Sequence, residues 1–485
     1  MQIDIEDKIN SLRYQIRELL KNQDWQNAII LGDFLIELTP EDPVVHYHMG
    51  IAWLNLNDLD QSEKFLQQAQ ELGDDSAEIL LLLGEVCSYR GDLNGEFFWA
   101  KKAIEREPDN INAHFVIAYA YLNIGHLQEA EAAFKDILER DPVNVQAHSA
   151  LADIFLLTQR LEDAEDQLRE AIKIQPDNGS LYADLGHTLT RMKKDDDALA
   201  VFLTALDLEP DIPERYYNVG DTYLALGNEE KSVLYLRKAS QMAPENSLYH
   251  YDLGLAFFTL KRYEDCARES EAALRNDPEM RFGRTNLGMS AMENLGLAYM
   301  HLEKYEDAEA CFQRNLHLVA STYFNLGLTL FRQKKFEDAL IHFKHATDLV
   351  PNDPEYWDLV GNAYLELNKL NDAQKALEKS IEIDPTYALS YYDLGVMFSQ
   401  IKGRENEAIK FFKRAISLGE DSHHPHYALA CLYSLKNKRR FALDHLGKAI
   451  QRGYKDREHI DHDPDFDSLR DEPEFQKLIK KIVRS

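Results

Sequence analysis

A fixed spacing of glycine and proline residues is the feature that most constrains the fold of this chain. Six glycines lie on one 34-residue grid, and alanines fill the two grid points between them: Gly50, Gly84, Ala118, Ala152, Gly186, Gly220, Gly254 and Gly288. Prolines repeat at the same interval from Pro108 to Pro278, and a second glycine series begins at Gly327. A sustained period of this length is typical of a solenoid built from small helical units that contact only their neighbours.

Residues 357–385 indicate that each unit is a pair of helices. Two stripes of residues three or four positions apart are each predicted to lie on one helix face: Trp357, Val360, Gly361 and Tyr364, then Ala373, Leu377 and Ser380. Asn368 separates the two helices, and Pro385 ends the second. Small residues let the helices approach closely, because a larger side chain there would overpack the contact at a cost of about 1–3 kcal/mol.

The pattern resembles the tetratricopeptide repeat (TPR) family, in which a bulky residue is followed by Leu-Gly, Tyr, Ala, an aromatic residue and Pro. It is also matched by His114, Ile117, Ala118, Tyr121, Ala130, Phe134 and Pro142. The resemblance extends over thirteen units, from about residue 9 to residue 456. It implies an all-α, right-handed superhelical α-solenoid of antiparallel helix pairs. Glu96 departs from the family's alanine, so we expect its helix pair to pack less closely.

One unit interrupts the grid. The stretch NLGMSAMENLGLAYMH, residues 286–301, repeats Asn-Leu-Gly after eight residues, and this unit is about 39 residues long. We expect an elongated first helix, with a kink or a short extra helix as the alternatives. The predicted domains are therefore units one to eight in residues 1–280, the irregular unit nine in 281–319, units ten to thirteen in 320–456, and a C-terminal segment, 457–485.

The C-terminal segment resembles the closing segment of many bacterial TPR arrays. Four apolar residues are expected to cover the face that the last unit leaves open: Phe466, Leu469, Phe475 and Leu478. Pro473 suits the first turn of a short last helix.

The TPR resemblance also implies where a ligand binds, because it places the fifth, sixth and ninth residues of each unit on an inner face. The candidate peptide-binding residues are the aromatic fifth residues Tyr217, Tyr251 and Phe324, and the polar sixth residues Asn218, Asp252, Asn286, Asn294 and Asn325. An asparagine amide offers an acceptor and two donors, so a row of them can pair with an extended peptide backbone. The row resembles the asparagine ladder in the TPR region of O-GlcNAc transferases. The alternative is that Asn and Asp are simply common at this position. If the asparagines face a groove, replacing them should leave folding nearly intact.

Charge and composition limit the classes of molecule that could be the partner. The formal net charge is −30, and acids such as Glu85 and Asp153 fall at ninth positions, which favours a basic partner over nucleic acid. Acids coating a large solvated surface are the alternative. The sequence shows no apolar run long enough to span a membrane and no signal peptide at its start. Four scattered cysteines without a CxxC pair suit a reducing cytoplasm.

No catalytic motif, cofactor motif or established metal-ligand spacing is recognisable, so neither an enzyme nor a metal site is expected. The histidines at 423, 424 and 426 are close in sequence but lack a second ligand set. The leading hypothesis is a cytoplasmic scaffold that binds protein or peptide segments along the inner groove. The alternatives are a structural protein that assembles with copies of itself and an adaptor subunit for a separately encoded enzyme.

Overall fold

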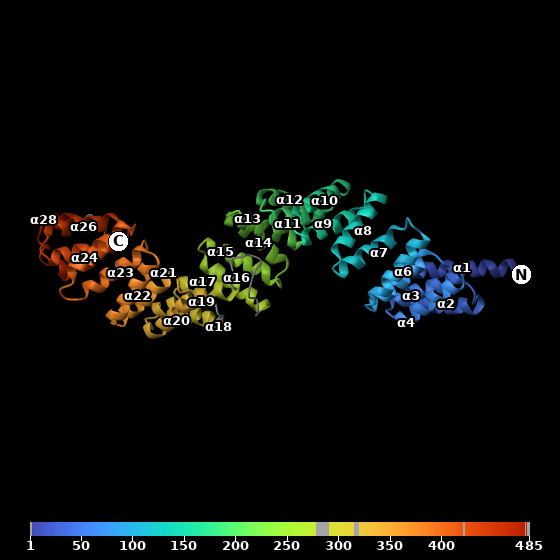
Figure 1. Ribbon diagram of the computed structural model, residues 1–485, viewed down its shortest axis with the longest axis horizontal. Helices are drawn as coiled ribbons and strands as arrows, with labels where there is room; N and C mark the ends of the chain where they lie inside the picture. Colours follow the sequence, from blue (N-terminus) through green and yellow to red (C-terminus); the bar gives the residue numbers. More distant parts are fainter. Residues whose placement is uncertain (1, 278–290, 315–319, 421, 481, 483–485) are drawn as a thin grey trace. The chain divides into compact units, whose positions relative to one another are not determined.

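The computed structural model describes residues 2–277, 291–314, 320–420, 422–480 and 482. Every regular element in these ranges is a helix, and no strand occurs in them. Figure 1 shows short helices that follow one another along the chain and turn back at each connection. The predicted fold class, an all-α solenoid of antiparallel helix pairs, is confirmed.

The residues group into two compact units, each of which contains several helix pairs. The first unit is Met1–Gly227 and the second unit is Asn228–Ser485. The helices of the first unit are α1 (Gln2–Lys21), α2 (Trp25–Leu38), α3 (Pro43–Asn55), α4 (Leu59–Glu71), α5 (Ala77–Tyr89), α6 (Leu93–Arg106), α7 (Ile111–Asn123), α8 (Leu127–Arg140), α9 (Val145–Leu157), α10 (Leu161–Ile174), α11 (Gly179–Arg191), α12 (Asp195–Leu208) and α13 (Pro213–Ala225).

The second unit continues the same alternation. Its helices are α14 (Glu229–Met242), α15 (Ser247–Thr259), α16 (Tyr263–Asn276), α17 (Ala291–His301), α18 (Tyr305–Arg314), α19 (Ala320–Arg332), α20 (Phe336–Leu349), α21 (Pro354–Glu366), α22 (Leu370–Ile383), α23 (Ala388–Ser399), α24 (Glu405–Ser417), α25 (His423–Leu435), α26 (Arg439–Gln451), α27 (Arg457–His462), the 3₁₀ helix η1 (Pro464–Phe466) and α28 (Pro473–Ile479).

The grid glycines hold the two helices of a pair together. A methyl group added at Gly361 of α21 would lie 2.6 Å from Leu377 of α22, and one added at Gly327 would lie 2.6 Å from Phe343. Such distances are well inside van der Waals contact, so the glycine leaves the space that the large side chain sixteen residues later fills. Leu377 and Phe343 are fully buried as a result. Close packing therefore explains the glycine spacing in the sequence.

The turn between the two helices of a pair also follows a local rule. The residue that ends the turn adopts a positive φ, as in Gly125 (77°), Asn57 (61°) and Asn368 (55°). Glycine and asparagine tolerate this left-handed conformation better than most residues, which explains why Asn368 interrupts the helical pattern. Asparagine also caps many helix starts; the Asn144 side chain, for example, accepts the Ala147 backbone N–H at 3.1 Å.

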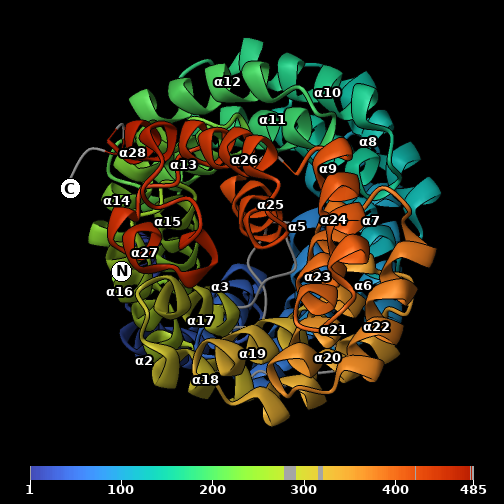
Figure 2. The same ribbon diagram turned by 90° about the vertical axis from the view of Figure 1, so that its left-hand side faces the viewer.

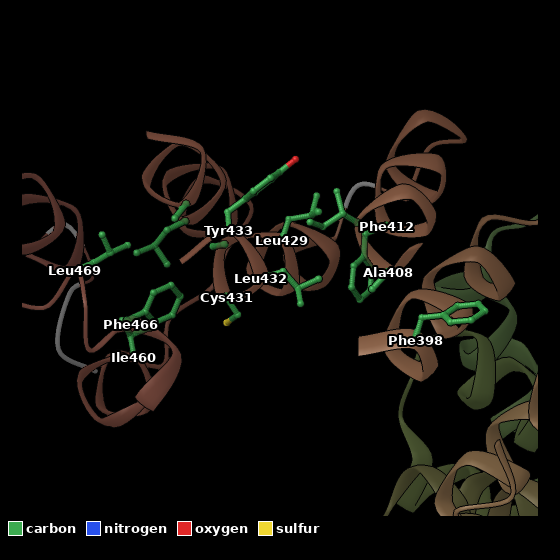
Figure 3. Close-up of a cluster of buried hydrophobic side chains, with 14 of the residues drawn as sticks. Phe398, Ala408, Phe412, Leu429, Cys431, Leu432, Tyr433, Ile460, Phe466 and Leu469 are labelled. Atoms are coloured by element: carbon green, nitrogen blue, oxygen red, sulfur yellow. The ribbon is translucent and has the colours of Figure 1, made fainter. Parts of the chain in front are cut away.

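The C-terminal segment packs on the last helix pair. Phe466, Leu469 and Phe475 are fully buried in one cluster with residues of α25 and α26, and Figure 3 shows Phe466 and Ile460 beside Cys431 and Leu432. Leu478 is half-buried and lies at the edge of this cluster. The apolar side chains of this segment therefore shield the open face of the last pair from water.

The described residues include only part of the irregular unit, 291–314. Gly296 in α17 docks against α18, because an added methyl group would lie 2.8 Å from the Phe312 ring. The second copy of the repeated Asn-Leu-Gly thus performs the packing role of a grid glycine. Asn286 and Gly288, with the expected elongation of the first helix, lie outside the described residues, and the domain boundaries stay a prediction.

Candidate peptide-binding face

The first helices of successive pairs line one side of each unit. In Figure 2, α9 and α11 of the first unit lie inside α10 and α12, and α21 of the second unit lies inside α22. The fifth, sixth and ninth residues of a pair belong to these inner helices. The predicted binding residues are therefore on the elements that the TPR resemblance implies, and their accessibility depends on how the side chains pack.

Most of the predicted aromatic and acidic candidates are buried. Tyr217 in the first unit and Tyr251 and Asp252 in the second have almost no exposed surface. Phe324 is half-buried, and its ring centroid lies 5.1 Å from that of Tyr356 on the next inner helix. Of the three aromatic candidates, Phe324 offers the most surface to a ligand.

Asn294 is fully enclosed. Its amide nitrogen donates to the Ser270 hydroxyl at 3.2 Å, and its carbonyl oxygen lies 3.7 Å from the Cys266 sulfur, both on α16. These contacts join α17 to the preceding helix pair. The expectation that this side chain is freely accessible from a groove is therefore revised, because the helices bury it. Asn286, its counterpart in the first copy of the repeat, lies outside the described residues.

Asn325 and Asn218 also contact the preceding pair. The Asn325 amide nitrogen lies 3.4 Å from a carboxylate oxygen of Glu293, which the Ser321 hydroxyl also reaches at 3.3 Å. In the first unit, the Asn218 amide nitrogen lies 3.5 Å from the His187 ring nitrogen. Asn325 keeps 9% of its surface exposed and Asn218 keeps 3%. The row of amides therefore forms contacts between neighbouring pairs, and its use by a peptide stays a prediction.

Carboxylates on the inner helices of the first unit are more accessible. Asp153 on α9 and Asp184 on α11 are exposed, yet the surrounding protein limits their solvation. This reduced solvation, with a contribution from the charge of Asp153, raises the pKa of Asp184 to about 6. Reduced solvation also raises the pKa of Glu85 on α5. An incoming cation would stabilise the ionised form of each group.

A second acidic arrangement was not predicted from the sequence. Asn362 on α21 places its amide nitrogen 3.1 Å from a carboxylate oxygen of Asp358 and 3.0 Å from one of Asp393 on α23. The Ser390 hydroxyl donates to the other Asp358 oxygen at 2.6 Å. Burial raises the pKa of both acids, and a hydrogen bond joins them. The charge of Asp393 raises the pKa of Asp358 further, whereas the hydrogen bond with Asp358 lowers the pKa of Asp393, which is about 6. The only sequence signal for this arrangement is that the residues fall at inner-face positions of two consecutive helix pairs.

The histidine cluster does not converge on a common point. His426 pairs with His445 of α26, with 2.9 Å between their Nδ1 atoms, while the rings of His423 and His424 lie 4.0 Å apart. Burial, with the nearby His426, lowers the pKa of His445 to about 4. Among the described residues, these histidines do not supply three ligand atoms close enough to share a metal ion.

Another cluster of side chains has the spacing that a metal ion requires. Ligand atoms of Cys431, Asp463 and Asp465 all lie within 4.8 Å of one another. Asp463 already accepts the Tyr427 hydroxyl at 2.6 Å with one oxygen and the Asp465 backbone N–H at 3.0 Å with the other. Burial raises the pKa of the Cys431 thiol, which keeps it protonated. These contacts link α25 to the C-terminal segment by hydrogen bonds.

Comparison with known proteins decides the family. Sequence profiles described as tetratricopeptide repeat match residues 115–179, 179–212, 213–246, 288–352 and 388–421, and one described as TPR repeat matches 361–402. Together these matches span more than half of the chain. The chain belongs to the tetratricopeptide repeat family. The TPR pattern that the sequence predicts is therefore confirmed.

Individual relatives of this TPR protein are similar over short stretches. A chloroplastic protein of Arabidopsis thaliana is 32% identical over 94 residues, which are 19% of this chain and 28% of that protein. Anaphase-promoting complex subunit CDC16 of Saccharomyces cerevisiae is 31% identical over 115 residues, 22% of this chain and 14% of that subunit. The chain thus spans less than a third of either relative's length.

Solved structures are similar to this chain at low sequence identity and with TM-scores below 0.5. The APC/C hetero-tetramer Cut9-Hcn1 has a TM-score of 0.41 and 16% identity, covering 87% of this chain and 96% of that one. YrrB, described as a TPR protein with an unusual peptide-binding site, has a TM-score of 0.34 and 18% identity, covering 42% and 97%. In the part of the TPR chain that the structure describes, no helix is long and apolar enough to cross a membrane.

Proposed function

We propose that this TPR protein is a non-catalytic scaffold that binds basic protein or peptide segments along the inner helices of its units. The observation that supports this most strongly is the set of carboxylates Glu85, Asp153 and Asp184 on the inner helices of the first unit. In the described residues none of them has a lysine or arginine at ion-pair distance, and reduced solvation raises the pKa of each. A cationic segment would supply the missing charge.

We further propose that the sixth-position residues contribute to binding. The half-buried Phe324 and the buried Asn325, which keeps 9% of its surface exposed, place an aromatic ring and an amide at consecutive positions of α19. Asn218 and Tyr217 are the equivalent pair in the first unit. They are buried almost as deeply as Asp252, Tyr251 and Asn294, so the inner helices would need to separate before a peptide could reach any of these five residues.

Site-specific photocrosslinking tests the inner face directly. A photoreactive phenylalanine analogue replaces Phe324, and a second variant carries it at Ile341, an exposed position on the outer helix α20 of the same pair. In extract of the native host, the Phe324 variant should yield discrete adducts that the Ile341 variant does not. Equal adducts at both positions, or adducts only at Ile341, would contradict binding on the inner face.

Self-assembly is a second candidate function, because α2 carries an exposed apolar stripe. Ile30, Phe34 and Leu38 are four residues apart and each is more than half exposed. Such a stripe suits contact with another apolar surface. Light scattering during size-exclusion chromatography should show a monomer if the stripe is solvated. A dimer that a Phe34→Asp variant abolishes would support self-assembly instead.

The cellular setting is proposed on chemical grounds. All four cysteines are free thiols, and three of them are buried. Unpaired thiols are typical of a reducing compartment, so we propose a cytoplasmic location. An adaptor role for a separately encoded enzyme is compatible with the same inner-face binding and differs from it only in what the partner does.

A further inference from the structure

One helix pair in the first unit departs from the packing rule of the others. Ala130 and Ala164 occupy the family's small position in the two following pairs and are fully buried. Glu96 occupies that position on α6 and is only half-buried. A methyl group added at Gly84 on α5 would lie 3.5 Å from its nearest neighbours on α6, compared with 2.6 Å at Gly361. The side chain sixteen residues after Gly84 is the small Ala100 rather than a leucine or phenylalanine, so less side-chain volume fills the contact between α5 and α6 at this point.

A cavity of about 460 Å³ lies beside this looser contact, within the first unit. Helices α3, α5, α6 and α7 contribute to its wall. Leu81, Leu82 and Val116 give it an apolar side, and Glu78, Glu85 and Glu96 give it three carboxylates. Among the described lining residues there is no lysine, arginine or histidine. Few natural ligand groups match such a wall, because an acidic group would be repelled and an apolar group would leave the carboxylates unsolvated.

The carboxylates differ in what already contacts them. Glu78 accepts the Tyr47 hydroxyl at 3.2 Å, so one of its oxygens has a donor. Glu96 has an oxygen, Oε2, that is buried without a hydrogen-bond partner. Burial raises the pKa of Glu96 and of Glu85, in keeping with the lack of a neighbouring cation. Glu96 and Glu85 each interact with a neighbouring hydroxyl, of Ser88 and of Tyr89 respectively, but with no cation among the described residues. A charged donor would therefore stabilise the ionised form of both, and it would also satisfy the free oxygen of Glu96.

We infer that this cavity receives the side chain of an arginine or lysine from a bound segment. The aliphatic stem would lie against Leu81 and Leu82, and the charged end would donate to Glu85 and to the unpartnered oxygen of Glu96. Long cationic side chains combine these two properties, and charge-assisted hydrogen bonds to carboxylates are stronger than neutral ones. The inference rests on the proposed function, since it assigns the residue type that a bound segment inserts into the inner face.

An array of immobilised dodecapeptides tests the inference on the intact chain. The peptides share random-sequence contexts and differ in a fixed central residue: arginine, lysine, citrulline or glutamate. Citrulline keeps the shape of arginine and removes its charge. The variant Glu85→Gln/Glu96→Gln removes two carboxylates at nearly constant volume. Its matched control, Glu105→Gln/Glu162→Gln, removes two exposed carboxylates from the outer helices α6 and α10 of the same unit.

Arginine-centred and lysine-centred peptides should bind the wild type about ten-fold more tightly than citrulline-centred ones, and the first variant should abolish that difference while the control keeps it. Equal losses in both variants would mean that net charge alone attracts the peptides, which overturns the subsite. Binding that does not depend on the central residue would overturn the subsite and leave the scaffold function standing. Binding to no peptide class would overturn both.

Discussion

Replacing Phe466 by alanine tests whether the C-terminal segment stabilises the end of the helical array. The Phe466 ring is fully buried, and its centroid lies 5.8 Å from that of Tyr427 on α25 and 5.6 Å from that of Phe475 on α28. Removing a buried phenylalanine ring costs about 3–5 kcal/mol, because the apolar transfer energy is lost and a cavity remains. We expect this loss to fall on α25–α28, since the stability of a repeat array is distributed over neighbouring units.

Hydrogen exchange measured by mass spectrometry resolves where the stability is lost. A cost of about 3–5 kcal/mol corresponds to a decrease of roughly two to nearly four orders of magnitude in amide protection for segments that open together. The matched control is Phe441→Ala on α26, since Phe441 is 54% exposed. Protection in α19–α22 should change little in either variant. Indistinguishable exchange in the two variants, or a loss spread evenly over the second unit, would refute the capping argument.

Three further substitutions test the packing and charge of the second unit. Asn294→Ala should reduce the free energy of unfolding by about 1–3 kcal/mol and lower the thermal midpoint, because it removes buried hydrogen bonds. An unchanged midpoint would indicate that the Asn294 side chain is exposed to water in a groove. Gly361→Ala should reduce the free energy of unfolding by about 1–3 kcal/mol, since the new methyl group collides with Leu377. The higher helix propensity of alanine offsets this loss by up to about 1 kcal/mol. Increased resistance to urea would contradict the close packing. Asp393→Asn should stabilise the protein at pH 8, on the order of 1–2 kcal/mol, and much less at pH 4. Burial, with the charge of Glu420, holds the pKa of Asp393 at about 6. The folded state therefore binds more protons than the unfolded state between the ordinary aspartate pKa and about 6, and it loses stability as the pH rises through that window. Melting curves at both pH values measure this, and equal stabilisation at pH 4 and pH 8 would argue against it.

The regular part of the fold is predictable from the sequence because it depends on local rules. Gly361 and Leu377 are sixteen residues apart, as are Gly327 and Phe343, and the pairing requires only that a small residue face a large one. Asn368 interrupts the pattern where a left-handed turn is needed. The C-terminal phenylalanines could be assigned to a closing segment because an exposed array end requires apolar cover.

The polar part of the candidate site was harder to predict. The sequence indicates that Asn294 lies on an inner helix, but its burial depends on the position of Ser270 on the helix before it. The proximity of Asp358 and Asp393 likewise depends on the spacing between pairs, which no local pattern encodes. Glu96 was recognised as a departure from the pattern, yet the cavity beside it follows from how α5 and α6 pack. Each of these features is set by neighbouring units.

The contact between Asn325 and Glu293 has a consequence for recognition. A peptide that pairs with the Asn325 amide must first take it from the carboxylate of the preceding pair, so one hydrogen bond is exchanged for another. Because a single exchange of this kind changes the free energy by only about 1 kcal/mol in either direction, the amide row cannot by itself supply a high affinity. A peptide bound at Asn325 would instead break a contact between adjacent helix pairs. Its main effect would then be to make the solenoid more flexible at that point.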